Sequence, residues 1–217
     1  MAKKARPDVE ERVDSMVGWL ELHSRELMYV SIGLLVVAGG FWFYRQSNER
    51  QAQSASTALT EAQSAIAAGN LPLAQSDLEK LVQRYASTPA GVQAHVLLAQ
   101  VHYSKGEYQQ GIQELNSVTD DKDAYTAAAA MNLAAAGLEQ SGKYAEAAAA
   151  YQTAAKKAPY KIDRDVYMAS AARALTTAGK TDEAKKIWSD LANDDRSAAS
   201  AEAKVRLGEL EAKGGPG

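Results

Sequence analysis

Apolar and polar positions along this chain repeat with the three- and four-residue spacing of α-helices. Met131, Ala134, Ala135 and Leu138, for example, fall on one face of a helix. Abundant alanine, sparse β-branched residues and an aromatic content of 7% agree with this pattern, because alanine is the strongest helix former. The 217 residues therefore predict an all-α protein of one or two domains.

Four glycines divide the helical pattern at nearly constant intervals of 37, 36 and 37 residues. A small residue follows each glycine by five positions and a large apolar residue by nine, as Ala147 and Tyr151 do in the third copy and Trp188 does in the fourth. Glycine tolerates the positive φ that ends a helix before the chain turns back. One helix pair cannot bury its apolar face alone, so the pattern predicts four stacked pairs. The four glycines are Gly69, Gly106, Gly142 and Gly179.

The pattern resembles the tetratricopeptide repeat over roughly residues 55–197. The resemblance implies a right-handed solenoid of helix pairs in a repeat domain over 55–213, with a last helix over 198–213 as its cap and a frayed tail over 214–217. The second copy has Gly111 where the family has alanine. The third copy matches best, through Met131, Ala135, Leu138, Gly142, Tyr144, Ala147, Tyr151, Ala154 and Pro159.

The same resemblance implies a partner-binding groove lined by the first helix of each pair. Its lining is neutral and mixed, without the lysine and asparagine cluster of repeats that clamp a C-terminal carboxylate. The alternative interpretation is that these residues form ordinary solvated helix faces. The positions are Gln93, Val96, Gln100 and Tyr103 in the second copy, Asn132, Ala136 and Glu139 in the third, and Arg173 and Thr176 in the fourth.

Residues 27–44 break the globular pattern with eighteen uncharged residues, LMYVSIGLLVVAGGFWFY. A helix of that length extends roughly 27 Å, close to the hydrocarbon thickness of a bilayer. A small-residue cleavage site does not follow, so we predict an uncleaved transmembrane anchor rather than a signal peptide, with a buried core helix as the alternative. The residues that mark its two ends are Leu27, Tyr29, Trp42 and Tyr44.

The segments on either side of residues 27–44 suggest an orientation. Five lysines and arginines precede the anchor and two closely follow it, which predicts a cytoplasmic N-terminus and an exported repeat domain. Residues 1–26 predict an amphipathic cytoplasmic helix that lies on the membrane or docks a partner. Residues 41–68 contain neither glycine nor proline, so we expect residues 45–54 to form a helical stalk.

This order of features resembles the ancillary SecYEG translocon subunit family of bacterial envelopes. The stretch that carries it is ERVDSMVGWLELHSRELMYVSIGLLVVAGGFWFYRQSNERQAQSAS. The resemblance implies an inner-membrane protein whose periplasmic repeats help exported chains to meet chaperones. The alternative is a structural subunit of a larger inner-membrane complex, such as an energy-transducing assembly.

The sequence contains no pattern that predicts catalysis. Absence of cysteine removes disulfide scaffolds, zinc–thiolate sites and thiol nucleophiles, and no phosphate-binding, zinc-protease or serine-hydrolase motif is present. A net charge of −3 disfavours nucleic-acid binding. His95 and His102 lie seven residues apart, where we expect packing roles rather than a shared metal. We therefore predict a non-enzymatic protein without cofactor, metal or small-molecule substrate. Its partners are expected to be proteins: a membrane complex, or exported chains and chaperones.

Overall fold

The computed structural model of the chain describes residues 16, 19 and 24–214, without the side chains of residues 24, 26, 27, 30, 31, 213 and 214. All regular structure in these residues is helical, which confirms the predicted all-α class. Contacts divide the chain into two compact units, residues 1–51 and 52–217. Most of the amphipathic segment expected over 1–26 lies outside the described residues.

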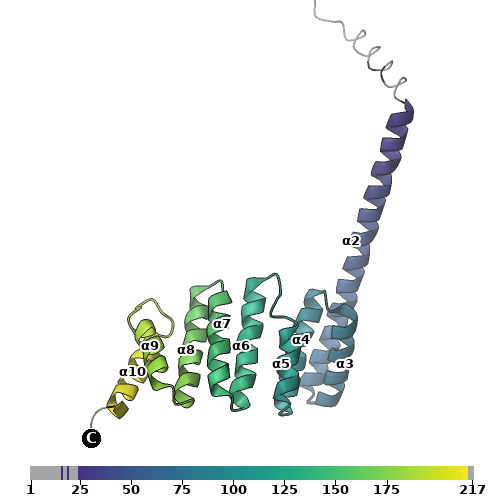
Figure 1. Ribbon diagram of the computed structural model, residues 1–217. Coiled ribbons are helices and arrows are strands. Elements are labelled where there is room, and N and C mark those ends of the chain that lie inside the picture. Colours follow the sequence, from purple (N-terminus) through teal and green to yellow (C-terminus); the bar gives the residue numbers. More distant parts are fainter. Residues whose placement is uncertain (1–15, 17–18, 20–23, 215–217) are drawn as a thin grey trace, which may run out of the picture. The chain divides into compact units, whose positions relative to one another are not determined.

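The second unit is a row of helices in which each packs against the next in the chain. Figure 1 shows α3 to α10 side by side in sequence order. Helix α2 spans Ser24–Ala67, and its residues from 52 onward belong to this unit. The other helices are α3 (Leu71–Tyr85), α4 (Pro89–Ser104), α5 (Tyr108–Asn116), α6 (Ala124–Gln140), α7 (Tyr144–Lys157), α8 (Lys161–Thr177), α9 (Thr181–Ala192) and α10 (Ser200–Gly214).

Each helix pair is closed by the same glycine turn. The four glycines have φ angles of 74°, 76°, 79° and 75°, a region that side chains with a Cβ disfavour. In the third pair the N–H of Gly142 donates to the carbonyl of Glu139 at 3.0 Å, and that of Lys143 donates to Leu138 at 2.9 Å. The same two bonds recur at the other three turns. Together they satisfy carbonyls that the helix end would leave without partners.

The residues that follow each turn glycine build the core between the helices. The small residues five positions on are all buried, which allows the two helices to approach closely. The large residues nine positions on fill the space against the neighbouring pair, and burial of one such side chain stabilises the fold by roughly 1.5–3 kcal/mol. These large buried residues are Leu78, Leu115, Tyr151 and Trp188.

Position 111 has glycine instead of the alanine that is usual at this point of the repeat. The reason is that a tyrosine occupies the space that a Cβ would need. A Cβ there would contact the ring of Tyr103, and one at Gly137 would contact the same ring. The hydroxyl of Tyr103 donates to the carbonyl of Leu133 at 3.3 Å. Tyr103 therefore joins its own helix α4 to both α5 and α6.

Capping residues define where the first helices of two pairs begin. The Thr88 hydroxyl accepts from the N–H of Gly91 at 3.0 Å at the start of α4. The Asp123 carboxylate accepts from the N–H of Thr126 at 2.9 Å at the start of α6. At the end of α7, Ala158 is extended, as a residue before proline prefers. Pro159 thus separates α7 from α8.

The last helix begins two residues later than the sequence pattern indicates. The N–H of Ser197 donates to Asp194 at 2.8 Å, and that of Ser200 donates to Ser197 at 3.1 Å. These consecutive turns occupy the residues before α10. At the other end Gly214 belongs to the helix rather than to the expected frayed tail.

Helix α2 changes character along its length. Within residues 52–67, Leu59 and Ala62 are buried against Leu78 and Leu81 of α3. In the predicted anchor, the described large apolar side chains are exposed, including those of Tyr29, Trp42 and Tyr44. Among the residues that the structure describes, no helix is both long enough and apolar enough to cross a membrane.

The glycine turns give a direct stability prediction. Replacing Gly142 with alanine forces a Cβ into a backbone with φ of 79° and should lower the free energy of unfolding by about 1–2 kcal/mol. Gly208→Ala is the matched control, because Gly208 is helical and its added Cβ would meet no atom within 4 Å. Urea unfolding of the full chain, followed by circular dichroism, measures both. Equal effects of the two substitutions would contradict the role given to Gly142.

Candidate functional site

The first helices of the pairs share one face, which we call the first-helix stripe. Its positions lie 17, 13, 10, 6 and 3 residues before each turn glycine. The groove residues expected from the sequence all lie on it. Gln93, Gln100 and Thr176 are exposed, and Val96, Tyr103, Asn132, Ala136, Glu139 and Arg173 are half-buried.

An apolar pocket of about 370 Å³ opens on the stripe between α4 and α6. Gln93 and Val96 are the two groove residues from the sequence that line it. Its walls are mainly hydrocarbon, and its floor continues into the buried cluster around Ala99 and Leu115. Val92, Gln93 and Val96 of α4 and Tyr125, Ala129 and Leu133 of α6 line the pocket.

Exposed apolar side chains continue the stripe from this pocket onto α8. Ile162 and Val166 stand 17 and 13 residues before Gly179, the positions that Tyr125 and Ala129 hold in α6. Ile162 is 62% exposed and Val166 45%. The apolar end of the stripe is our name for these stripe residues together with two pocket residues beside them, Val92 and Leu133. Its stripe residues are Val96, Tyr125, Ala129, Ile162 and Val166.

Two tyrosines form a ring pair beside the apolar end. Tyr125 and Tyr160 have centroids 6.0 Å apart at an interplanar angle of 60°. They are 49% and 60% exposed, so their outer faces remain accessible. Sequence reasoning missed both, together with Ile162 and Val166. The positions 17 and 13 residues before each turn glycine continue the spacing of the expected groove residues toward the helix starts. Including those positions would have identified Tyr125, Ile162 and Val166, but not Tyr160.

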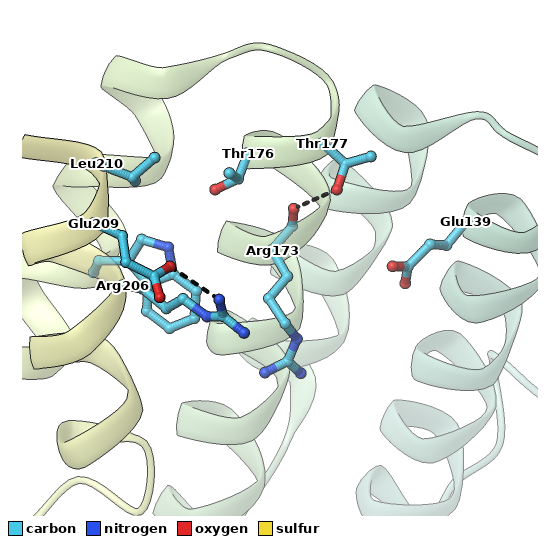
Figure 2. A pocket seen from close by; sticks show the side chains of 8 residues that line it. Glu139, Arg173, Thr176, Thr177, Arg206, Glu209 and Leu210 are labelled. Atoms are coloured by element: carbon cyan, nitrogen blue, oxygen red, sulfur yellow. Dashed lines mark hydrogen bonds and ion pairs between the residues drawn. The ribbon is translucent and has the colours of Figure 1, made fainter. Parts of the chain in front are cut away.

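The other end of the stripe is a polar pocket of about 320 Å³ between α6, α8 and α10. Figure 2 shows the side chains of Glu139, Arg173 and Arg206 directed toward the same space. Thr176, Thr177 and Glu209 also line it. Of the groove residues expected from the sequence, this pocket brings together Glu139, Arg173 and Thr176.

Charged groups in the polar pocket are paired within the protein. One guanidinium nitrogen of Arg173 donates to both carboxylate oxygens of Glu202 at 2.8 and 2.9 Å. Arg206 donates to Glu209 at 3.0 Å, and the Tyr151 hydroxyl donates to Glu139 at 2.8 Å. The Arg173–Glu202 contact joins α8 to α10, so this end of the stripe holds the capping helix to the fourth pair.

Two tyrosines next to the stripe have perturbed ionisation. Burial raises the pKa of Tyr103 to about 12. Burial is also the main cause that raises the pKa of Tyr151, and its hydrogen bond to Glu139 adds to that effect. Both phenols are therefore neutral hydrogen-bond donors at physiological pH.

The two histidines of the second repeat make contacts within that repeat. His95 Nδ1 lies 2.8 Å from a carboxylate oxygen of Glu114 on α5. His102 Nδ1 lies 2.7 Å from a carboxylate oxygen of Glu107, which follows the glycine turn. In the described part of the chain, no group of three or more histidine, aspartate or glutamate side chains is placed to hold a metal ion.

Comparison with known proteins agrees with this geometry. A family model described as the tetratricopeptide repeat-like domain matches residues 18–211. The chain belongs to the tetratricopeptide repeat-like family. Among solved structures, it is similar to nearly identical TPR-like repeats of a Podosopora anserina protein assigned as a kinesin light chain, with a TM-score of 0.56 and 17% identity over 73% of this chain and 86% of the other. No curated protein sequence matches the chain.

These matches establish the helical-repeat fold and confirm the broader of the two resemblances. The identity to the solved structure is too low to carry more than the fold. Neither the family description nor the name of this solved structure refers to a translocon subunit, so the narrower resemblance stays a proposal.

The raised pKa of Tyr103 predicts a loss of stability in alkali. An unfolded tyrosine releases its proton near pH 10, whereas folded Tyr103 holds it to about 12. Between these values the unfolded state binds fewer protons, so the stability of the fold decreases as pH rises. Tyr103→Phe should make this loss of stability smaller. The loss that remains is expected to come from Tyr151 and Tyr167, whose pKa values are also raised.

Urea unfolding of the full chain at pH 8 and pH 11 measures the effect. Tyr160→Phe is the control, because Tyr160 is 60% exposed. A pH dependence in Tyr103→Phe equal to that of the unmodified chain would contradict the assignment.

Proposed function

We propose that the protein is a membrane-tethered scaffold whose first-helix stripe binds a segment of another polypeptide. The observation that carries this proposal is the apolar end of the stripe, where a pocket of about 370 Å³ adjoins exposed apolar side chains. Clustered exposed apolar groups of this kind favour association with a partner. Stacked helix pairs supply a fixed surface for that contact.

The dimensions of the stripe suit an extended segment. The first helices α4, α6 and α8 alternate with second helices, and packed helices lie about 8–10 Å apart, so one first helix lies within roughly 20 Å of the next. An extended chain covers that distance with about six residues at roughly 3.3 Å each. A segment of this length could contact the pocket, Tyr125 and Val166 in turn.

The tether is proposed to be residues 27–44. Its support is the run of eighteen uncharged residues and the exposure of the described large apolar side chains within it. Such a surface is costly in water and is satisfied by lipid or by other apolar helices. Excess lysine and arginine before residue 27 support a cytoplasmic N-terminus and an exported repeat domain, periplasmic in a bacterium.

Two cellular roles fit such a scaffold. In the first, which the translocon-subunit resemblance favours, it is an adaptor that binds chaperones or emerging chains beside the secretion machinery. In the second it is a permanent subunit of an inner-membrane complex, which the exposed apolar face of residues 27–44 favours because other helices could pack there.

Purification in mild detergent followed by mass spectrometry separates these roles. An adaptor is expected to recover many exported proteins, each in less than stoichiometric amount. Stoichiometric recovery of one complex that survives high salt would favour the permanent subunit. Recovery of no protein beyond background would contradict the scaffold function itself.

The tether predicts a membrane phenotype for charged substitutions. Each arginine at the centre of a spanning helix costs about 2.5–3.5 kcal/mol. The double variant Leu35→Arg, Val37→Arg should therefore leave the membrane pellet after alkaline carbonate extraction. The matched control Gln51→Arg, Gln53→Arg adds the same charges to a polar, exposed part of the same helix and should stay in the pellet. Release of the unmodified chain, or retention of both variants, would contradict the tether.

A further inference from the structure

Asp163 places a carboxylate among the side chains of the apolar end. It stands 16 residues before Gly179, the position that Thr126 holds before Gly142, and Thr126 lines the apolar pocket. Its neighbours on the stripe are Ile162 and Val166, both exposed. A negative charge among apolar groups limits which partners can bind there.

Cations close to Asp163 in the sequence are engaged elsewhere. Lys161 pairs with Asp165 at 2.6 Å and with Asp194 at 2.9 Å. The Arg164 guanidinium donates to the backbone carbonyls of Ala158 and Pro159, at 3.2 and 3.0 Å. Within the described residues, the structure gives the Asp163 carboxylate no ion pair with a cation of the chain, so its charge is available to a partner.

The ring pair lies at the same end of α8 as this carboxylate. Tyr160 is the N-cap residue of α8, and Asp163 follows it by three positions in the first turn of that helix. Tyr125 lines the apolar pocket and pairs with Tyr160. Exposed aromatic faces attract cations, because the electron density of the ring is concentrated on its faces.

We propose that the apolar end binds a partner segment in which an apolar side chain is adjacent to a lysine or arginine. The apolar side chain enters the pocket between α4 and α6. The cation lies between the Tyr125 and Tyr160 rings and the Asp163 carboxylate. This inference rests on the proposed function and adds the chemistry of the partner.

Charge complementarity selects this partner over an acidic one. A partner carboxylate would meet both Asp163 and the negative faces of the rings, and both contacts are repulsive. The polar pocket offers a weaker alternative, because the Arg173 and Arg206 charges already have carboxylate partners. The apolar end is thus the part of the stripe with an unmatched charge beside an open apolar pocket.

The test uses the full chain in non-ionic detergent and three fluorescein-labelled synthetic peptides of equal length. Their centres are Arg-Leu-Leu-Arg, Glu-Leu-Leu-Glu and Arg-Ser-Ser-Arg, and binding is measured by fluorescence anisotropy against detergent alone. The first peptide should bind at least roughly tenfold more tightly than the others, because only it supplies both an apolar side chain and a cation.

Variants of the chain identify the two contacts. Asp163→Asn should weaken binding of the first peptide roughly fivefold, and Ala129→Leu should weaken it by filling the pocket. Asp190→Asn and Ala149→Leu are the matched controls, since both residues are exposed on second helices, and they should leave the affinity unchanged. Circular dichroism verifies that each variant is folded.

The possible outcomes separate this inference from the function on which it rests. Loss of affinity in Asp163→Asn and Ala129→Leu alone supports both. A second outcome is that Ala129→Leu blocks binding, whereas neither the charge of the peptide nor Asp163→Asn changes the affinity. That result overturns the basic-partner inference and leaves the scaffold function in place. Absence of binding by all three peptides overturns the inference, and the scaffold then depends on the mass-spectrometry result.

Discussion

Reversal of the chain at a left-handed glycine is the constraint on which the rest of the repeat unit depends. At Gly69, Gly106, Gly142 and Gly179 the chain adopts a φ between 74° and 79°, and two backbone hydrogen bonds close each turn. Most residues with a Cβ cost roughly 1–2 kcal/mol there. Because the turn fixes where the second helix starts, it also fixes which residues meet the first helix. The buried small residue and the large residue one turn later then follow at constant distances.

The same register creates a surface with two different ends. Toward the starts of the first helices, apolar side chains and the Tyr125–Tyr160 pair surround an open pocket. Toward their ends, Arg173 of α8 donates to Glu202 of α10, and Tyr103 of α4 donates to the Leu133 carbonyl of α6, so hydrogen bonds there join successive repeats. Side-chain hydrogen bonds between repeats are thus placed at one end of the stripe, and accessible apolar surface at the other. The capping helix α10 contributes to the hydrogen-bonded end through Glu202.

Much of the fold could be predicted from the sequence because its determinants are local. Positive φ requires glycine, and helix spacing follows from apolar residues three and four positions apart. Gly111 could not be explained in this way, since the ring that excludes a Cβ comes from Tyr103 on the preceding helix. The start of α10 was misplaced because turns between Asp194 and Ser200 carry helix-forming residues.

The candidate site was predicted less completely than the fold. Gln93, Val96, Glu139, Arg173 and Thr176 were expected from family positions to line one groove, and the structure places them in two separate pockets. Ile162 and Val166 were missed, because apolar residues at a helix start are usually core. The sequence could not predict that the Asp163 carboxylate lacks an ion pair with a nearby cation. It depends on Lys161 reaching Asp194, thirty-three residues further along the chain.

The most direct test asks which face of the repeats contacts other polypeptides in the cell. The photoreactive amino acid p-benzoylphenylalanine is placed at position 129 on the first-helix stripe or at position 149 on an exposed second-helix face, in the full chain. Illumination of intact cells should join discrete polypeptides to position 129 and few or none to position 149. Equal crosslinking at both positions, or crosslinking at position 149 alone, would contradict the assignment of the stripe as the binding surface.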